Sequence, residues 1–346
     1  MANDLEEEST APEAPAQNPT GLEAVELCRS ASQQLQKEIA KVIVGQTDVV
    51  EEILIAILTR SHALLVGVPG LAKTLLISTL AKTLQMSFKR IQFTPDLMPS
   101  DITGTEVIYT DATTGSKEFR FLQGPLFSNI VLADEINRTP PKTQAAMLEA
   151  MQERRVTVGG TTHKLPDPFF VLATQNPLEQ EGTYPLPEAQ LDRFLFLIHV
   201  GYPSLDEEIE IMRRGTGGKV EEPQPVLNGE HILYIQETVK ALPVADHVYN
   251  YASSIVRCTR PKEADALDYC RQYLSFGAGP RASLSLIMAA KAHALIRGQL
   301  YAGCEDVAAI AKAVMRHRIA VNFTAQSEGI TADTVVTKVL ETIPAR

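Results

Sequence analysis

The loop Gly67-Val68-Pro69-Gly70-Leu71-Ala72-Lys73-Thr74 decides the fold of this chain. It lies between an apolar run at Ala63–Val66, which is typical of a buried strand, and a helical pattern over Thr74–Leu84. Strand, glycine-containing loop and helix in this order form the context of a phosphate-binding loop. Glycines let successive backbone N–H groups face an anion at the helix N-terminus, and Lys73 adds a charge for the β and γ phosphates. Thr74 offers a hydroxyl to Mg²⁺, so we expect residues 67–75, including Leu75 in the first helical turn, to hold a nucleotide.

Position 72 leaves the chain one residue short of the strict pattern, which has glycine where this chain has alanine. Alanine is the smallest substitute, and we expect it to be tolerated if Ala72 has helical dihedral angles. Taken alone, the loop could still be an ordinary connection between a strand and a helix. The interpretation as a nucleotide site therefore depends on further signals elsewhere in the chain.

Two adjacent carboxylates, Asp134 and Glu135, directly follow the apolar run Ile130–Ala133. Ligands of α/β sheets bind at the carboxyl ends of the strands, so these side chains stand where chemistry is expected. We expect Asp134 to hold Mg²⁺ and Glu135 to take up the proton of an attacking water. The alternative is that two acids after a strand only solvate a loop. It loses weight because a phosphate-binding loop lies about sixty residues upstream.

A third apolar run, Phe169–Thr174, leads into Gln175-Asn176-Pro177 and places an amide at another strand end. Asn176 could orient the water, although Asn-Pro also opens ordinary turns. With the runs at 129–133 and 194–200 and the helical pattern over Pro141–Arg154, strands and helices alternate. Such alternation predicts βαβ units and a mainly parallel sheet.

Strand signals end after Gly201-Tyr202-Pro203, and the long helical patterns that follow predict a helical second domain. These patterns cover about 205–214, 229–241, 246–258, 280–297, 303–320 and 331–342. Between the phosphate loop and the carboxylates, residues 101–124 read as two strands around Thr113-Thr114-Gly115-Ser116, which predicts a β-hairpin. A surface hairpin without a contact role is the plainer interpretation of that segment.

Composition narrows the class of protein. The chain has 346 residues, 45% of them hydrophobic, which is enough for two ordinary domains. With 32 Lys and Arg against 42 Asp and Glu, the net charge of −10 disfavours nucleic acid binding by the surface as a whole.

No apolar run is long enough for a bilayer span and the acidic N-terminus is unlike a secretory signal, so we expect a cytoplasmic protein. The four cysteines and seven histidines lack metal-ligand spacing, so oxygen atoms should bind any metal. Residues 1–22, acidic and proline-containing, are expected to be a disordered tail.

Taken together, these motifs resemble the AAA+ ATPases, and specifically the MoxR-type group, from about residue 40 to the end of the chain. The resemblance is carried by the phosphate loop, by Asp134-Glu135-Ile136-Asn137-Arg138, by Ala173-Thr174-Gln175-Asn176-Pro177 and by Glu188-Ala189-Gln190-Leu191-Asp192-Arg193-Phe194. The family's motif accepts alanine at position 72. The resemblance implies an α/β core at 23–203, with a mainly parallel five-stranded sheet between helices, and a smaller all-helical lid domain at 204–346. The hairpin at 101–124 corresponds to the family's helix-2 insert, which in such hexamers points toward the central pore and is a candidate for contact with a client.

The resemblance also implies roles that spacing alone does not indicate. Arg193 resembles the arginine finger, which reaches the γ phosphate bound by the neighbouring subunit, and Asn176 resembles the sensor 1 residue. Arg281, in Gly279-Pro280-Arg281-Ala282, resembles the sensor 2 arginine at the start of a lid helix. Val44 and Gly45 resemble the adenine-contacting turn. Cations around a phosphoryl group in transfer stabilise its developing negative charge, which gives both arginines a physical purpose.

The resemblance therefore predicts Mg²⁺-dependent hydrolysis of ATP to ADP and phosphate at the subunit interfaces of a homo-oligomer, a hexameric ring. MoxR-type proteins are associated with partners that carry a von Willebrand factor A domain and with maturation or metal insertion of a protein client. Two alternatives stay open. One is a nucleic-acid motor or magnesium-chelatase-like subunit, against which the acidic net charge counts. The other is a nucleotide-bound scaffold without turnover, although every expected catalytic side chain is present.

Overall fold

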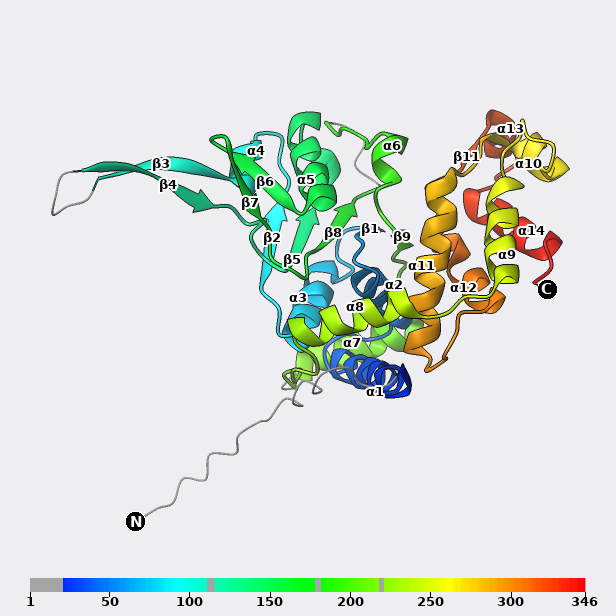
Figure 1. Cartoon of the computed structure of the whole chain (residues 1–346), viewed down its shortest axis with the longest axis horizontal. Helices are drawn as coiled ribbons and strands as arrows, with labels where there is room; N and C mark the ends of the chain where they lie inside the picture. Colours follow the sequence, from blue (N-terminus) through cyan, green and yellow to red (C-terminus); the bar gives the residue numbers. More distant parts are fainter. Residues whose placement is uncertain (1–20, 111–115, 178–181, 218–220, 346) are drawn as a thin grey trace, which may run out of the picture.

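A parallel five-stranded sheet lies at the centre of the protein. The computed structural model describes residues 21–110, 116–177, 182–217 and 221–345. The strand order is β2-β5-β8-β1-β9, and every neighbouring pair is parallel (Figure 1). The strands are β1 (Ala63–Val66), β2 (Phe88–Gln92), β5 (Ile130–Asp134), β8 (Phe170–Gln175) and β9 (Phe196–His199). The predicted α/β class with a mainly parallel sheet between helices is confirmed.

Both faces of this sheet are buried, which explains why its inner strands are continuous apolar runs. Along β5, Ile130 and Leu132 join one hydrophobic cluster, whereas Val131 and Ala133 join the other. This alternation follows from the period of two in a strand. Helices α2 and α3 supply the first cluster and α5 the second. The helical layers hold the carboxyl ends of the strands in place, and those ends carry the predicted site.

The helices before the lid flank the sheet as Figure 1 shows. They are α1 (Gly21–Ala40), α2 (Thr47–Leu58), α3 (Lys73–Thr83), α4 (Pro99–Thr103), a 3₁₀ turn (Ile136–Arg138), α5 (Pro141–Glu153), α6 (Glu188–Leu191), α7 (Leu205–Gly217) and α8 (Gly229–Ala241). Helix α1 was not predicted, and it begins two residues inside the segment 1–22 that was assigned to a tail. Residues 1–20 of that tail lie outside the described residues.

Two β-hairpins project from the core. The predicted hairpin is confirmed as β3 (Gly104–Thr110) paired antiparallel with β4 (Lys117–Gln123), and it extends away from the body in Figure 1. Most of its predicted turn, residues 111–115, lies outside the described residues. The second hairpin, β6 (Arg155–Val158) with β7 (Thr161–Lys164), was not predicted, although Gly159-Gly160 is a hairpin turn signal.

The lid region, defined here as α9 to α14, is mainly helical as predicted. Its helices are α9 (Asp246–Arg257), α10 (Asp268–Tyr273), α11 (Pro280–Ile296), α12 (Cys304–Met315), α13 (Phe323–Ser327) and α14 (Ala332–Thr342). It differs from an all-helical lid by one short antiparallel pair, β10 (Leu274–Phe276) with β11 (Ala320–Val321). The predicted helix over 303–320 ends at Met315, because the residues that follow turn back to the core. In the part of the chain described, no helix has the length and apolar character needed to span a bilayer.

Candidate functional site

The loop between β1 and α3 has the backbone of an anion-binding turn. Gly70 has a φ of +89°, a conformation that a side chain would strain. A Cβ atom at Gly67 would lie 2.9 Å from the Val200 carbonyl oxygen, so glycine is needed for this close approach. Lys73 Nζ donates to the Gly67 carbonyl oxygen at 2.6 Å and thus lies across the loop. Burial lowers the pKa of Lys73, while the nearby Asp134 and Glu135 carboxylates act to raise it.

The condition under which alanine was expected to be tolerated at position 72 is not met. Ala72 has φ 54° and ψ 24°, which is the left-handed region rather than the helical one. Helix α3 begins only at the following residue, Lys73. Left-handed backbone costs about 1–2 kcal/mol for a residue with a Cβ atom. The loop therefore needs the conformation that glycine favours, and the chain accommodates alanine there with some strain.

Asp134 ends β5 within a network of polar contacts. Thr174, on the adjacent strand β8, donates from Oγ1 to Asp134 Oδ1 at 2.6 Å. Arg90, on the other side in β2, donates from Nε and Nη2 to Asp134 Oδ2 at 3.0 and 2.7 Å. These three bonds fix the rotamer of the carboxylate at the carboxyl edge of the sheet. Lys73 and Asp134 thus lie near each other, as the two sequence motifs predicted.

Glu135 leaves the strand through strained backbone. Its φ is 58° and its ψ 49°, and its N–H donates to Thr174 Oγ1 at 2.9 Å. Non-glycine residues in this region cluster at functional sites, where the surroundings fix them. Gln92 Nε2 and Arg138 Nη1 donate to Glu135 Oε2 at 2.8 and 2.9 Å. Gln92 and Arg90 were missed from the sequence because β2 itself was not predicted.

Asn176 directly follows β8, the strand that lies between β5 and β1 in the sheet. It is only 5% exposed. The residue before it, Gln175, accepts a hydrogen bond at its carbonyl oxygen from the Gly67 N–H at 3.4 Å. The sheet therefore brings the phosphate loop, the two carboxylates and Asn176 to one edge.

An apolar cavity of about 800 Å³ adjoins the loop. Its lining includes the predicted Val44, Gly70, Leu71, Ala72 and Leu75. Sequence reasoning missed the opposite wall, which is formed by Gly201, Tyr202, Pro203, Glu207, Ile211 and Arg214. The signal was available, because 201–203 follows the end of β9 and ligands bind beyond strand ends.

Gly45 lies beside this cavity and against its wall. An ideal Cβ atom at Gly45 would lie 2.0 Å from Glu207 Oε1, and the φ of Gly45 is +69°. Glu207 is held in turn by the Ser204 N–H, which donates to Glu207 Oε2 at 2.8 Å. Glycine at position 45 thus allows α7 to approach the turn at 42–46.

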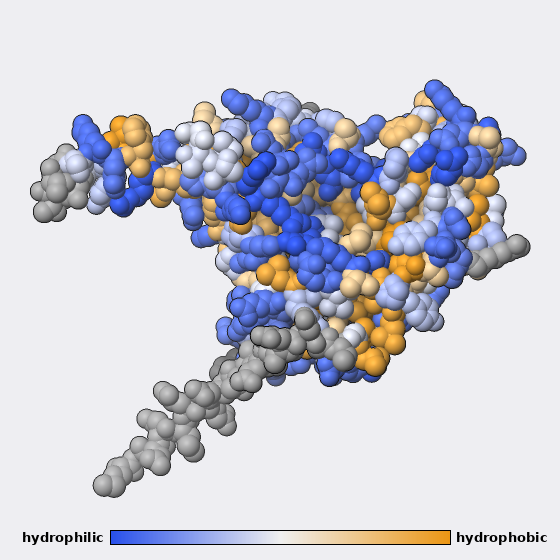
Figure 2. Space-filling view, viewed as in Figure 1, coloured by the Kyte–Doolittle hydropathy of each residue, from blue (hydrophilic) through white to orange (hydrophobic). Residues whose placement is uncertain are grey.

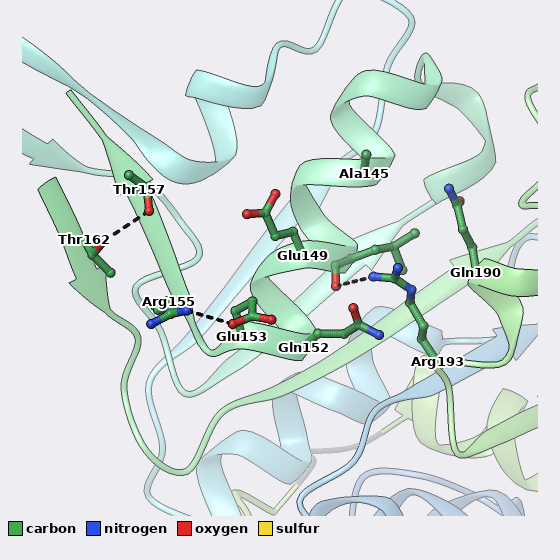
Figure 3. A pocket seen from close by; sticks show the side chains of 10 residues that line it. Ala145, Glu149, Gln152, Glu153, Arg155, Thr157, Thr162, Gln190 and Arg193 are labelled. Atoms are coloured by element: carbon green, nitrogen blue, oxygen red, sulfur yellow. Dashed lines mark hydrogen bonds and ion pairs between the residues drawn. The ribbon is translucent and has the colours of Figure 1, made fainter. Parts of the chain in front are cut away.

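Arg193 and Arg281 lie together on a different surface. Arg193 Nη1 donates to the Leu148 carbonyl oxygen at 3.3 Å, beside a polar cavity of about 590 Å³ between α5 and β6–β7 (Figure 3). A smaller cavity of about 220 Å³ is lined by both arginines and by Asp192, whose Oδ2 is 3.6 Å from Arg281 Nη1. Within the described residues, neither arginine lines the apolar cavity beside the loop.

The residues present fit a nucleotide with Mg²⁺. An N–H-rich loop with a lysine adjoins an apolar cavity of a size that suits a base. Two oxygen-bearing side chains belong to the same region, because Thr74 follows Lys73 in α3 and the Asp134 carboxylate lies near Lys73. Among residues 21–110, 116–177, 182–217 and 221–345, no group of three or more His, Cys, Asp or Glu side chains is placed to hold a metal.

Comparisons with known proteins agree with this geometry. The model of the ATPase family associated with various cellular activities matches residues 62–196, and the model of its lid domain matches residues 268–339. The chain is 45% identical over 306 residues to the chaperone MoxR1 of Mycobacterium tuberculosis, covering 88% of this chain and 80% of that protein. It is 30% identical to the protein MoxR of Methylorubrum extorquens, covering 92% and 96%. A solved structure from Cytophaga hutchinsonii that carries an ATPase assignment superposes with a TM-score of 0.86 at 41% identity, covering 94% and 97%.

Proposed function

The chain belongs to the AAA+ ATPases of the MoxR type, and from this premise we propose that it hydrolyses ATP between the subunits of a homo-oligomeric ring. The observation that supports a shared site is the position of Arg193 and Arg281, which line a cavity separate from the phosphate loop. One chain alone would then offer phosphate-binding and water-activating groups without the arginines. A neighbouring copy would supply both arginines together. In this proposal Arg281 acts, like Arg193, on the nucleotide bound by the neighbouring chain and not on the nucleotide of its own chain.

In this proposal each residue of the site has a separate role. Lys73 turns from the Gly67 carbonyl oxygen toward the phosphates, and the glycine N–H groups bind their oxygens. Glu135 accepts the proton of the attacking water, which Asn176 orients, and Gln92 releases the carboxylate for this step. Thr74 and Asp134 would hold Mg²⁺, which when bound neutralises charge on the phosphate oxygens. Arg193 and Arg281 of the neighbour stabilise the charge that develops in the transition state.

We further propose that each part of the chain has a separate role. Residues 23–203 form the nucleotide core. Residues 204–346 form the lid domain, which comprises α7, α8 and the lid region defined above, and the helix-2 insert at 101–124 is the client-contacting element. On β3–β4 several apolar side chains are exposed, among them Ile108 at 63% and Phe119 at 74%. Figure 2 shows apolar residues on this projecting hairpin. A relative of this chain is named a chaperone, which supports the proposal that ATP turnover drives the remodelling of a protein client. The proposal includes a hexameric ring and a partner bearing a von Willebrand factor A domain.

The test is Mg²⁺-dependent ATP hydrolysis by wild type and by Glu135→Gln over a range of protein concentrations. We expect the specific activity of the wild type to rise with concentration, because each site needs a neighbour. Glu135→Gln should bind ATP with an affinity within about threefold of wild type and lose about 10²-fold or more in kcat. Equal inactivity of both proteins despite ATP binding would contradict turnover by this chain alone.

The shared site is tested separately. Lys73→Ala is expected to be inactive, and Arg193→Ala to keep a measurable residual rate, about 10³-fold below the wild-type kcat. Their mixture should regain part of the activity, because one type of interface then carries an intact pair. A constant specific activity for wild type at all concentrations, together with no regain in the mixture, would contradict the trans role of Arg193.

A further inference from the structure

Three consecutive residues after α12 connect the lid to the segment that carries Arg193. Arg316 Nη1 donates to the Leu197 carbonyl oxygen at 3.3 Å. His317 Nε2 lies 3.1 Å from the Phe194 carbonyl oxygen. Arg318 contacts Asp192, Phe194 and Leu195. This arrangement was not predicted, because Arg316-His317-Arg318 falls within the helix expected over 303–320.

Arg318 makes the most extensive of these contacts. Its Nε donates to Asp192 Oδ1 at 2.8 Å, and its Nη atoms donate to the carbonyl oxygens of Phe194 at 2.6 Å and Leu195 at 3.0 Å. Further bonds reach the Asp192 and Val314 carbonyl oxygens and Ser285 Oγ. The side chain is only 2% exposed. A guanidinium with this many charge-assisted bonds in a buried place holds its acceptors in a fixed geometry.

These bonds hold the main chain on both sides of Arg193. Arg193 itself has little to fix its direction, because within the described residues its side chain makes one hydrogen bond, from Nη1 to the Leu148 carbonyl oxygen at a long 3.3 Å. Its buried Nε has no partner in the described structure. The aim of the Arg193 side chain therefore depends on its backbone, and Arg318 fastens that backbone to the lid. Asp192 also faces Arg281 at 3.6 Å, so one carboxylate contacts two lid arginines.

We propose that Arg318 is a positioning residue for ATP hydrolysis, which aims Arg193 by clamping residues 192–195 to the lid of the same chain. This rests on the proposed role of Arg193 in the neighbour's site. A change in lid position then moves Arg193, and the nucleotide of the next subunit is affected without any contact from Arg318. Arg318 never touches substrate; it acts only through the backbone of residues 192–195.

The test is a double-mutant cycle between Arg318→Lys and Arg193→Ala in the full chain, measured as kcat and KM for ATP. Lysine keeps the charge but cannot donate to Asp192, Phe194 and Leu195 together. We expect Arg318→Lys alone to lower kcat about tenfold and to leave KM within about twofold. In the Arg193→Ala background the same substitution should change kcat by less than about twofold, because the side chain to be aimed is gone.

Arg316→Lys is the matched control, because Arg316 also joins the lid to the core but binds Leu197 and Asp333 instead of the neighbours of Arg193. Arg316→Lys should change kcat by the same factor in the wild-type chain and in the Arg193→Ala chain. Thermal melting and oligomeric state identify a variant that fails to fold. In that case Asp192→Asn, which removes the charged partner of Arg318 at a half-buried position, replaces Arg318→Lys in the cycle.

Two outcomes overturn the proposal in different ways. If Arg318→Lys lowers kcat by the same factor with and without Arg193, the clamp is only structural, while the trans role of Arg193 stands. If Arg193→Ala alone leaves turnover unchanged, the proposed finger fails and there is nothing for Arg318 to aim.

Discussion

At the scale of single residues, backbone strain marks the phosphate loop. Ala72 has a positive φ of 54°, which glycine adopts without the steric penalty of a Cβ atom. Ala72→Gly should therefore remove about 1–2 kcal/mol of strain, while the freer unfolded chain returns about 0.4–1 kcal/mol. We expect the free energy of unfolding to rise by up to about 1.6 kcal/mol, with ADP affinity within about twofold of wild type. Urea unfolding and ADP titration measure these two quantities.

Gln85→Gly is the control for this substitution. Gln85 has a φ of 45° at the end of α3, away from the loop, so it offers the same relief of backbone strain. The two variants should gain similar stability. A loss of stability in Ala72→Gly together with a gain in Gln85→Gly would contradict the view that strain is what alanine adds at position 72.

At the scale of elements, one hairpin supports the other. Phe121 of β4 stacks on His163 of β7, with ring centroids 3.9 Å apart and an interplanar angle of 16°, and meets Phe127 edge-on at 5.4 Å. Phe119, two residues earlier on the same strand and face, is 74% exposed. We expect Phe121→Ala to lower the free energy of unfolding by about 1–3 kcal/mol and Phe119→Ala by less than about 0.5 kcal/mol. Urea unfolding of both variants tests this, and equal losses would contradict a supporting role for the stack.

Elements were predicted from the sequence where local signals sufficed. The loop at 67–74, the carboxylates after β5 and the hairpin at 104–123 all have periods or turn residues that act within a few positions. Strand β2 was missed because Lys89 and Arg90 interrupt its apolar pattern at the sheet edge. The Arg318 clamp was missed for another reason. Its acceptors Asp192, Phe194 and Leu195 lie more than 120 residues away in the sequence, and only tertiary structure brings them to Arg318.

At the scale of the whole molecule, buried titratable side chains in the core and the lid make the free energy of unfolding depend on pH. His62 Nδ1 accepts from the Val171 N–H at 3.0 Å, so its Nε2 carries the hydrogen that is donated to the Met151 carbonyl oxygen. Burial lowers the pKa of His62 to about 4, and burial also places the pKa of His317 well below its ordinary value. Glu52 of α2 is the opposite case, because burial raises its pKa to about 7 despite Arg316 nearby.

The pKa shifts of His62 and Glu52 change the free energy of unfolding in opposite directions as pH falls. Between about pH 4 and 6.5 the His62 imidazole binds a proton in the unfolded chain but not in the folded protein. The free energy of unfolding therefore decreases as pH falls through this window. Between about pH 4.5 and 7 folded Glu52 keeps a proton that the unfolded chain releases, so its contribution is lost as pH rises. Each difference of one proton changes the unfolding free energy by about 1.4 kcal/mol per pH unit. We therefore expect a steeper loss between pH 6.5 and 4.5 in Glu52→Gln than in wild type, and a shallower one in His62→Gln. Urea unfolding at half-unit pH steps measures these slopes, and parallel slopes for all three proteins would show that neither group keeps its shifted pKa in the folded state.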